Sequence, residues 1–263
     1  MVIDELLKKL PKNINGTVKI ILAANPLSIA ESRRANSIDN IDLNRIFPGD
    51  FSKTLTERLA HKLIDIIKDS DAVIDLHSFE MQTPLMGILC SSKSKTALAN
   101  KSLMQDFCPK QVWVIDAEIQ KEKQFGKSLL PVLTELNLPN IAIEMNNPAI
   151  IDDAQITECV NGLLRVISAK KIIEQQKDIS ETFNFFNRTV VHSPEEGIFL
   201  PLHKTFEIVK QGAVIGLLRK LLDQSEIKIT SPCNGQIMQV LQRNFVRPGQ
   251  EIIAIGERVE VII

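Results

Sequence analysis

The sequence predicts an α/β fold, in which a layered domain with a mostly parallel or mixed sheet is followed by an all-β module. In the first two thirds, short apolar runs of strand length alternate with longer segments whose apolar residues recur at helical spacing. In the last third, β-type runs follow one another closely and a turn motif occurs twice. We therefore expect an α/β domain over residues 1–178 and a C-terminal barrel or sandwich over residues 179–263.

The composition argues against nucleic-acid and membrane binding. The 31 Lys and Arg residues nearly balance the 32 Asp and Glu residues, so no strong positive field attracts nucleic acid or an anionic membrane. No apolar run approaches the roughly 20 residues that span a bilayer. The four cysteines lie far apart without C-x-x-C spacing, which is typical of reduced thiols. We therefore expect a cytoplasmic protein without a nucleic-acid or membrane partner.

The elements of the α/β domain are indicated by apolar spacing and by turn residues. Residues 2–10 place apolar side chains on one helical face, and Pro11 ends this helix. Residues 18–24 form an apolar run of strand length that the following Asn-Pro pair closes. Residues 27–50 show little periodicity and predict a long loop, which in a compact domain is usually functional. The elements expected after this loop are a helix over 54–68, strands over 72–76, 85–89 and 112–115, a helix over 127–136, a strand over 140–144 and a helix over 152–176.

An internal repeat marks the C-terminal module. The motif S-P-x-x-G occurs at 193–197 and again at 231–235, and an x-G turn follows each copy, at Gly212 and at Gly249. Two such copies predict two related halves of a small barrel or sandwich. They resemble the biotinyl/lipoyl type of β module, but no lysine stands in the sequence setting typical of such carriers, and Lys204 comes nearest. A lid or an oligomerisation module is therefore favoured, and barrel edges would allow a homo-oligomer.

Candidate site residues gather at one edge of the predicted sheet. In open α/β sheets the ligand binds outside the carboxyl ends of the strands, and Asn25, His77 and Glu144 each end or follow a predicted strand there. His77 ends a buried strand, whereas the other three histidines lie in a predicted helix or in the β module. From the residues alone, Glu144 can equally end its strand in solvent, and Arg45 can equally form a surface ion pair.

Several short motifs occur in an order that resembles one protein family. They are A-N-P at 24–26, Arg34, D-L-N-R-I-F-P-G at 42–49, T-E-R-L-A at 56–60, D-L-H at 75–77 and I-A-I-E at 141–144. In this order the sequence resembles the succinylglutamate desuccinylase/aspartoacylase family over nearly its whole length. That resemblance implies a zinc-carboxypeptidase-like α/β domain and a zinc-dependent hydrolase, a deacylase. Such an enzyme cleaves the amide bond of an N-acyl amino acid or a related small-molecule substrate that carries a carboxylate.

The resemblance also implies roles for five residues. His77 would be a zinc ligand, and Glu144 would be the catalytic base that takes a proton from the metal-bound water. Arg34 would be catalytic by stabilising the oxyanion that forms at the scissile carbonyl. Arg45, with Asn44 beside it, would bind the substrate carboxylate, because a guanidinium pairs with a carboxylate through two parallel hydrogen bonds.

The sequence departs from the family pattern at the metal site. The first two zinc ligands of the family come from an H-G-x-E motif just ahead of the helix expected here over 2–10, and the sequence begins at that helix. A catalytic zinc normally has three protein ligands, whereas the resemblance assigns His77 alone. Two explanations stay open: the segment with these ligands is missing from the sequence as given, or the chain is a metal-free, non-catalytic relative that binds an acidic small molecule or serves as an assembly protein. Asn146 also stands where family members often have glycine.

Overall fold

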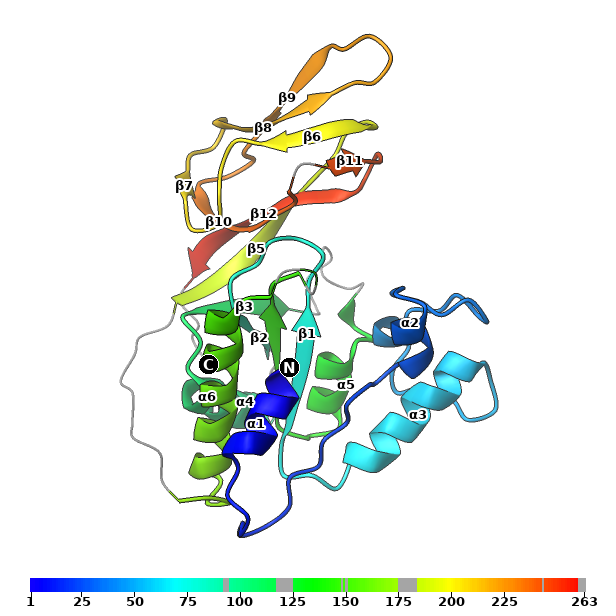
Figure 1. Ribbon diagram of the computed structural model, residues 1–263, viewed down its shortest axis with the longest axis vertical. Coiled ribbons are helices and arrows are strands. Elements are labelled where there is room, and N and C mark those ends of the chain that lie inside the picture. Colours follow the sequence, from blue (N-terminus) through cyan, green and yellow to red (C-terminus); the bar gives the residue numbers. More distant parts are fainter. Residues whose placement is uncertain are drawn as a thin grey trace.

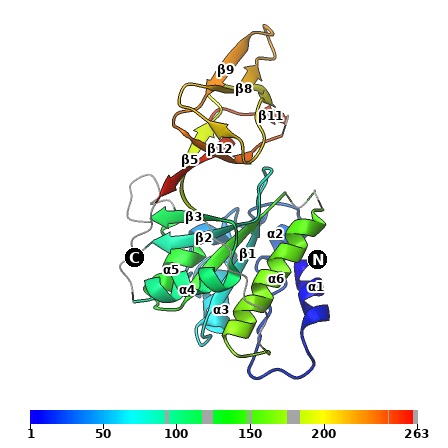
Figure 2. The same cartoon turned by 90° about the vertical axis from the view of Figure 1, so that its left-hand side faces the viewer.

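Two regions stack along the long axis of the molecule (Figure 1). The computed structural model describes residues 1–91, 95–116, 125–147, 149, 151–174, 184–242 and 244–259. Within these ranges, residues 1–174 contain all the helices and form the helical region, whereas residues 184–259 contain strands without a helix and form the strand-only region. Figure 2 shows that β5 (Asn184–His192) and β12 (Glu251–Val259) lie where the two regions meet.

One mixed sheet runs through both regions. Its strands, in spatial order, are β1 (Val73–Ser78), β4 (Asn140–Met145), β2 (Met86–Ser91), β3 (Gln111–Asp116), β5, β12, β10 (Gly235–Val240) and β7 (Ile208–Val209). The pairs β1·β4, β2·β3 and β3·β5 are parallel, whereas the other neighbours pair antiparallel. The α/β fold with a large mixed sheet is therefore confirmed.

Helices cover both faces of this sheet in the helical region. They are α1 (Val2–Lys9), α2 (Pro26–Ala30), the 3₁₀ turn η1 (Leu43–Arg45), α3 (Leu55–Ile67), α4 (Ala97–Phe107), α5 (Leu129–Glu135) and α6 (Asp153–Ala169). Alternate strand residues point to opposite faces, and Ile141 and Ile143 of β4 pack in one cluster with α1, α4 and α6. Ala142 lies between them and packs with Leu130 of α5 on the other face. None of the described helices combines the length and hydrophobicity that crossing a membrane requires.

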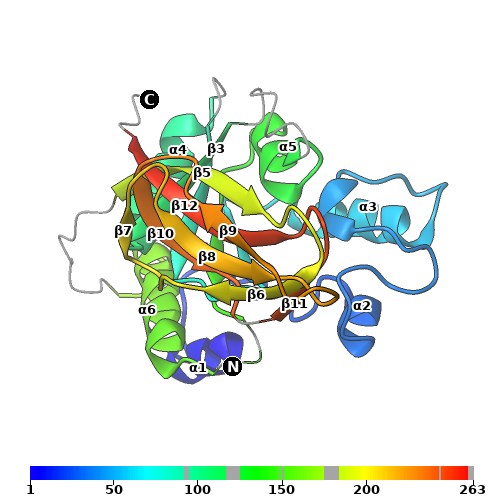
Figure 3. The same cartoon turned by 90° about the horizontal axis from the view of Figure 1, so that it is seen from above.

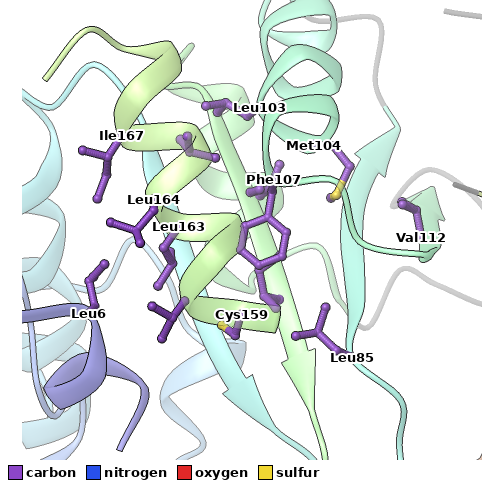
Figure 4. Packing of buried hydrophobic residues seen from close by; sticks show 14 of the residues in the cluster. Leu6, Leu85, Leu103, Met104, Phe107, Val112, Cys159, Leu163, Leu164 and Ile167 are labelled. Atoms are coloured by element: carbon purple, nitrogen blue, oxygen red, sulfur yellow. The ribbon is translucent and has the colours of Figure 1, made fainter. Parts of the chain in front are cut away.

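Close packing of α4 on α6 builds the core of the helical region (Figure 4). Phe107 at the end of α4 is fully buried, and its ring lies against Gly162 of α6. A Cβ at position 162 would lie 2.6 Å from Cζ of Phe107, so glycine permits this approach and a larger residue would displace the ring. Leu6 of α1 joins the same cluster, which confirms the predicted N-terminal helix.

The repeat of the strand-only region forms two equivalent turns. The hydroxyls of Ser193 and Ser231 each donate a hydrogen bond of 2.7 Å to the backbone carbonyl two residues later. The N–H of Gly212 donates to the Ser231 carbonyl and the N–H of Gly249 to the Ser193 carbonyl, both at 2.8 Å, so each copy closes the turn of the other. Both glycines have positive φ, of 81° and 79°, which glycine adopts without strain. The two copies of the sequence motif therefore form equivalent local structures.

A second sheet of four strands completes the strand-only region. Its strands, in spatial order, are β11 (Asn244–Val246), β6 (Gly197–Pro201), β8 (Val214–Arg219) and β9 (Glu226–Thr230). Seen from above, the strand-only region lies over the rest of the molecule, while α2 and α3 extend to one side (Figure 3). Phe199 and Ile215 of this sheet pack with Ile253 of β12. Because β5, β12, β10 and β7 also belong to the large sheet, a separate barrel or sandwich stays a prediction.

Two predicted elements differ from the structure. The strand predicted over residues 18–24 is wrong, because this segment forms no strand and Leu22 is 77% exposed. Among the described strands β1 pairs with β4 alone, and an apolar run without a pairing partner cannot become part of a sheet. The helix predicted over 152–176 ends at Ala169, because Lys171 has a φ of 60° and turns the chain. The domain boundary predicted at residue 178 lies outside the described residues.

Candidate active site

His77 and Glu144 lie side by side near the carboxyl ends of β1 and β4. The two strands pair parallel, and their register places His77 opposite Glu144. Asp75, two residues earlier on β1, is on the same face, and its Oδ2 lies 2.8 Å from Nε2 of His77. Glu144 is 6% exposed, whereas 31% of the His77 side chain is exposed. The alternative in which Glu144 ends its strand in solvent is therefore wrong.

Burial and neighbouring charges set the pKa values of this pair. Burial lowers the pKa of His77, but the charge and hydrogen bond of Asp75, together with the Glu144 charge, outweigh this and raise the pKa to about 9. Burial raises the pKa of Glu144, and the positive charges of His77 and Arg188 offset part of that rise. Arg34 lowers both pKa values, which places its guanidinium within electrostatic range of the pair. The two groups are therefore suited to hold and pass a proton.

Asp42 fixes the loop that carries the two candidate arginines. Its Oδ1 accepts the N–H of Asn44 at 2.9 Å and caps η1, and its Oδ2 accepts from Nε of Arg34 at 2.8 Å. The Arg34 side chain is 60% exposed. The aspartate of the D-L-N-R motif thus has a structural role, because it caps the turn that presents Arg45.

Arg45 is half-buried beside Phe125. Its Nη1 donates to the Asn44 carbonyl at 2.6 Å, and its guanidinium carbon lies 4.9 Å from the centre of the Phe125 ring. Among the described residues Arg45 forms no ion pair, so the surface ion pair is not observed. The Asn44 side chain accepts the N–H of Leu129 at 2.8 Å, which ties the loop to the start of α5. Asn44 therefore holds the loop, and its predicted contact with a substrate stays a prediction.

A buried polar network holds the earlier part of the loop against α3. The Asp39 carboxylate accepts the N–H and the hydroxyl of Thr56, each at 2.8 Å, and Nδ2 of Asn36 donates to the Thr56 hydroxyl at 2.9 Å. Asn36 and Thr56 are 1% and 0% exposed. The sequence predicts the loop but not this network, because side-chain pairing between distant positions leaves no local pattern. Gly49, near the end of the same loop, has a φ of 78°. A Cβ at this position would lie 2.6 Å from the backbone nitrogen of His61 in α3, so glycine allows the loop to approach the helix.

Arg188 of β5 is a residue of this site that the sequence did not reveal. Its side chain is 7% exposed, and its charge lowers the pKa of Glu144. Nε donates to Oε1 of Gln239 at 2.8 Å, and Nη2 donates to Oε2 of Glu251 at 2.7 Å. A single arginine within a β-type run, far from the motifs of the helical region, carries no sequence signal, because most arginines are exposed.

The described residues do not complete a zinc site. Within the described ranges, no group of three or more His, Cys, Asp or Glu side chains could hold a metal ion. His77 and Asp75 are adjacent donors, but a catalytic zinc takes three protein ligands. The donor set therefore does not fit the zinc that the resemblance implies.

The helical region matches a known family. Residues 1–165 match the model described as the succinylglutamate desuccinylase/aspartoacylase catalytic domain. A curated relative, the N-alpha-acetyl-L-2,4-diaminobutyric acid deacetylase of Halomonas elongata, is 35% identical over 68 residues, which are 26% of this chain and 20% of that protein. The chain thus matches only a fifth of the length of this relative.

Several solved structures share the fold over almost the whole chain. A succinylglutamate desuccinylase/aspartoacylase from Rhodobacter sphaeroides has a TM-score of 0.86 and 18% identity, with 99% of this chain and 81% of that chain covered. The product-bound ectoine utilization protein of Ruegeria pomeroyi has a TM-score of 0.84 and 17% identity, with 97% and 79% covered. An aspartoacylase family protein from Mesorhizobium loti has a TM-score of 0.80 and 20% identity, with 99% and 81% covered.

Proposed function

Because this chain belongs to the succinylglutamate desuccinylase/aspartoacylase family, we propose that it is a deacylase that cleaves the amide bond of an N-acyl amino acid or a related carboxylate-bearing amide. The observation that carries this proposal is the buried Glu144 opposite His77, within electrostatic range of Arg34. The activity of the Halomonas elongata relative, a deacetylase, supports an acyl amide as the substrate class.

The chain's own residues supply the groups that amide hydrolysis needs. Burial raises the pKa of Glu144, which suits it to take a proton from water and to return it to the departing amine. Arg34 is held through Nε by Asp42, and its exposed side chain supports the role of stabilising the oxyanion. Arg45 is held by the Asn44 carbonyl and the Phe125 ring, which supports a prearranged grip on the substrate carboxylate.

Zinc stands apart in this proposal. His77 is the ligand that the family resemblance assigns, and when bound a zinc ion would lower the pKa of its water. Because the described donors do not fit a three-ligand site, no step above is assigned to the metal. Elemental analysis after dialysis in trace zinc measures this directly, and close to one zinc per chain would show that His77 has further ligand partners.

A second candidate function follows from the incomplete metal site. A chain that keeps Arg34, Asn44 and Arg45 without a complete metal site would bind an acidic small molecule without cleaving it. The two candidates differ in turnover, since both predict that a carboxylate-bearing ligand binds.

We also propose that the strand-only region is a barrel-sandwich module that supports the site in either case.

Release of free amine from N-acyl amino acids tests the proposed function. The substrates are N-alpha-acetyl-L-2,4-diaminobutyric acid, N-acetyl-L-aspartate and N-succinyl-L-glutamate, each with added zinc and, in parallel, with a chelator. We expect amine release from at least one of them, and a difference between the zinc and chelator arms would show that a metal takes part. Binding without amine release from all three would contradict the deacylase and support the second candidate.

A further inference from the structure

Arg188 carries a buried positive charge from the strand-only region to the boundary with the helical region. A buried guanidinium destabilises a fold unless hydrogen bonds and an opposite charge compensate its lost hydration. Gln239 and Glu251 provide that compensation, at 2.8 Å and 2.7 Å. Both partners also come from the strand-only region, which therefore fixes the position of this guanidinium by itself.

The Arg188 guanidinium lies over two aromatic rings of the helical region. Its central carbon lies 4.9 Å from the centre of the Trp113 ring on β3 and 5.5 Å from the centre of the Phe79 ring, which directly follows β1. Attraction between a guanidinium and an aromatic face is strongest for tryptophan and increases when the pair is removed from water. Trp113 is 7% exposed, so this contact is largely removed from water.

The ring of Phe125 links Trp113 to Arg45. The rings of Trp113 and Phe125 meet edge to face, with centroids 5.8 Å apart and an interplanar angle of 83°. The Arg45 guanidinium lies over the other ring of this pair, 4.9 Å from the Phe125 centre. Arg188, Trp113, Phe125 and Arg45 therefore form an unbroken row of contacts, called here the aromatic row.

The partner of Arg188 acts on the same arginine. Burial lowers the pKa of Arg45, and the charges of Asp42 and, to a smaller extent, Glu251 offset part of that fall. In the structure, Oε2 of Glu251 is bound by Arg188.

We propose that Arg188 is a positioning residue of the carboxylate-binding site, which holds Arg45 in place through the aromatic row. The proposal rests on the proposed function, because it takes Arg45 as the group that binds the substrate carboxylate. Arg188 reduces the number of positions that the Arg45 side chain samples before binding, and a prearranged side chain binds more tightly. The strand-only region thereby affects affinity without supplying a group that reacts.

The single tryptophan makes the aromatic row observable. The chain contains one Trp and no Tyr, so emission excited at the tryptophan edge comes from Trp113 alone. We would titrate the full chain with N-acetyl-L-aspartate and follow this emission for the wild type, Arg45→Met, Arg188→Met and the double variant. Arg219→Met is the matched control, because Arg219 is also a β-strand arginine with a glutamate partner, Glu226, at 2.7 Å, but is 46% exposed.

The account predicts a graded and non-additive result. Arg188→Met should raise the dissociation constant roughly fivefold to tenfold, about the value of one desolvated cation–π contact. Arg45→Met should raise it more, and the double variant should bind no more weakly than Arg45→Met, because Arg188 acts through Arg45. Arg219→Met should bind as the wild type does.

Other results would separate the failure of this inference from the failure of the proposed function. Wild-type affinity in Arg188→Met, or additive losses in the double variant, would overturn the positioning role while leaving Arg45 as the carboxylate ligand. Wild-type affinity in Arg45→Met would overturn the proposed grip and the inference with it. If Arg188→Met does not fold, calorimetry on Trp113→Leu and Arg188→Lys replaces it. Trp113→Leu interrupts the row without removing a charge, and unchanged affinity in both variants would again overturn the positioning role.

Discussion

The helical region and the strand-only region connect their elements in different ways. In the helical region, a long loop between α2 and α3 contains Arg34 and Arg45 and is held by side-chain hydrogen bonds such as those of Asp39 with Thr56. In the strand-only region, the two copies of the repeat close each other's turns through backbone hydrogen bonds of Gly212 and Gly249. Side chains therefore fix the irregular backbone around Arg34 and Arg45, whereas backbone hydrogen bonds close the regular turns of the strand-only region.

The strand-only region also reaches the candidate active site. β5 pairs parallel with β3, from Gln111 opposite Asn184 to Trp113 opposite Phe186. Arg188 lies two residues beyond the last residue of β5 that pairs with β3, and its positive charge lies beside Trp113 of the helical region. On the proposed function, the helical region would supply the groups that bind and react, and the strand-only region would help to position them. The following predictions test that division.

The largest effect on turnover is expected at Glu144, the proposed catalytic base. Glu144→Gln should lower the turnover number roughly 100-fold or more while leaving substrate affinity nearly unchanged, because the amide keeps the shape of the side chain but cannot accept the proton. Amine release and ligand titration on the same preparation measure the two quantities. Glu196→Gln, at an exposed turn of the strand-only region, is the control. Equal loss in both variants would remove the distinction between the regions.

Core substitutions test whether the two regions unfold together. Phe107 in the helical region and Phe199 in the strand-only region are both fully buried. Replacing either with Ala should lower the free energy of unfolding by about 3–5 kcal/mol. Because one sheet runs through both regions, each variant should shift a single transition. Two separate transitions in calorimetry, with only one of them shifted, would show that the regions are independent units.

A pH-dependent stability term is expected from the helical region. The pKa of His77 is raised from 6.5 to about 9 in the folded chain, so its contribution to stability is fully present below pH 6.5 and is lost as the pH rises through 9. Urea unfolding in zinc-free buffer on either side of this range measures the loss. Asp75→Asn should reduce it, because Asp75 is the main group that raises the pKa. An identical pH dependence in this variant would contradict the assignment.

The smallest effect is expected from a surface ion pair of the strand-only region. Arg219 and Glu226 are 46% and 39% exposed, and Nη2 of Arg219 lies 2.7 Å from Oε1 of Glu226. Arg219→Met should change the free energy of unfolding by less than about 1 kcal/mol, because exposed ion pairs contribute little. Denaturant unfolding at low and high salt checks this. A loss comparable to that of Phe199→Ala would show that surface charge, and not the core, maintains this region.

The parts of the molecule that follow from local pattern could be predicted. The helix α3 follows from its apolar spacing and its start at Thr54, and His77 opposite Glu144 follows from the rule that ligands bind at the carboxyl ends of strands. The strand expected over 18–24 failed, because an apolar run does not specify its pairing partner. Arg188 could not be predicted, because its burial depends on contacts with Trp113 and Phe79, which are distant in the sequence.

Arg45 is the proposed carboxylate-binding residue of this site. The most direct test of this role compares the dissociation constant of N-acetyl-L-aspartate with that of its diamide, which has the same shape without the negative charges. We predict at least roughly tenfold tighter binding of the acid to the wild type, and loss of that difference in Arg45→Met. Equal affinity of the wild type for the acid and the diamide would contradict the account.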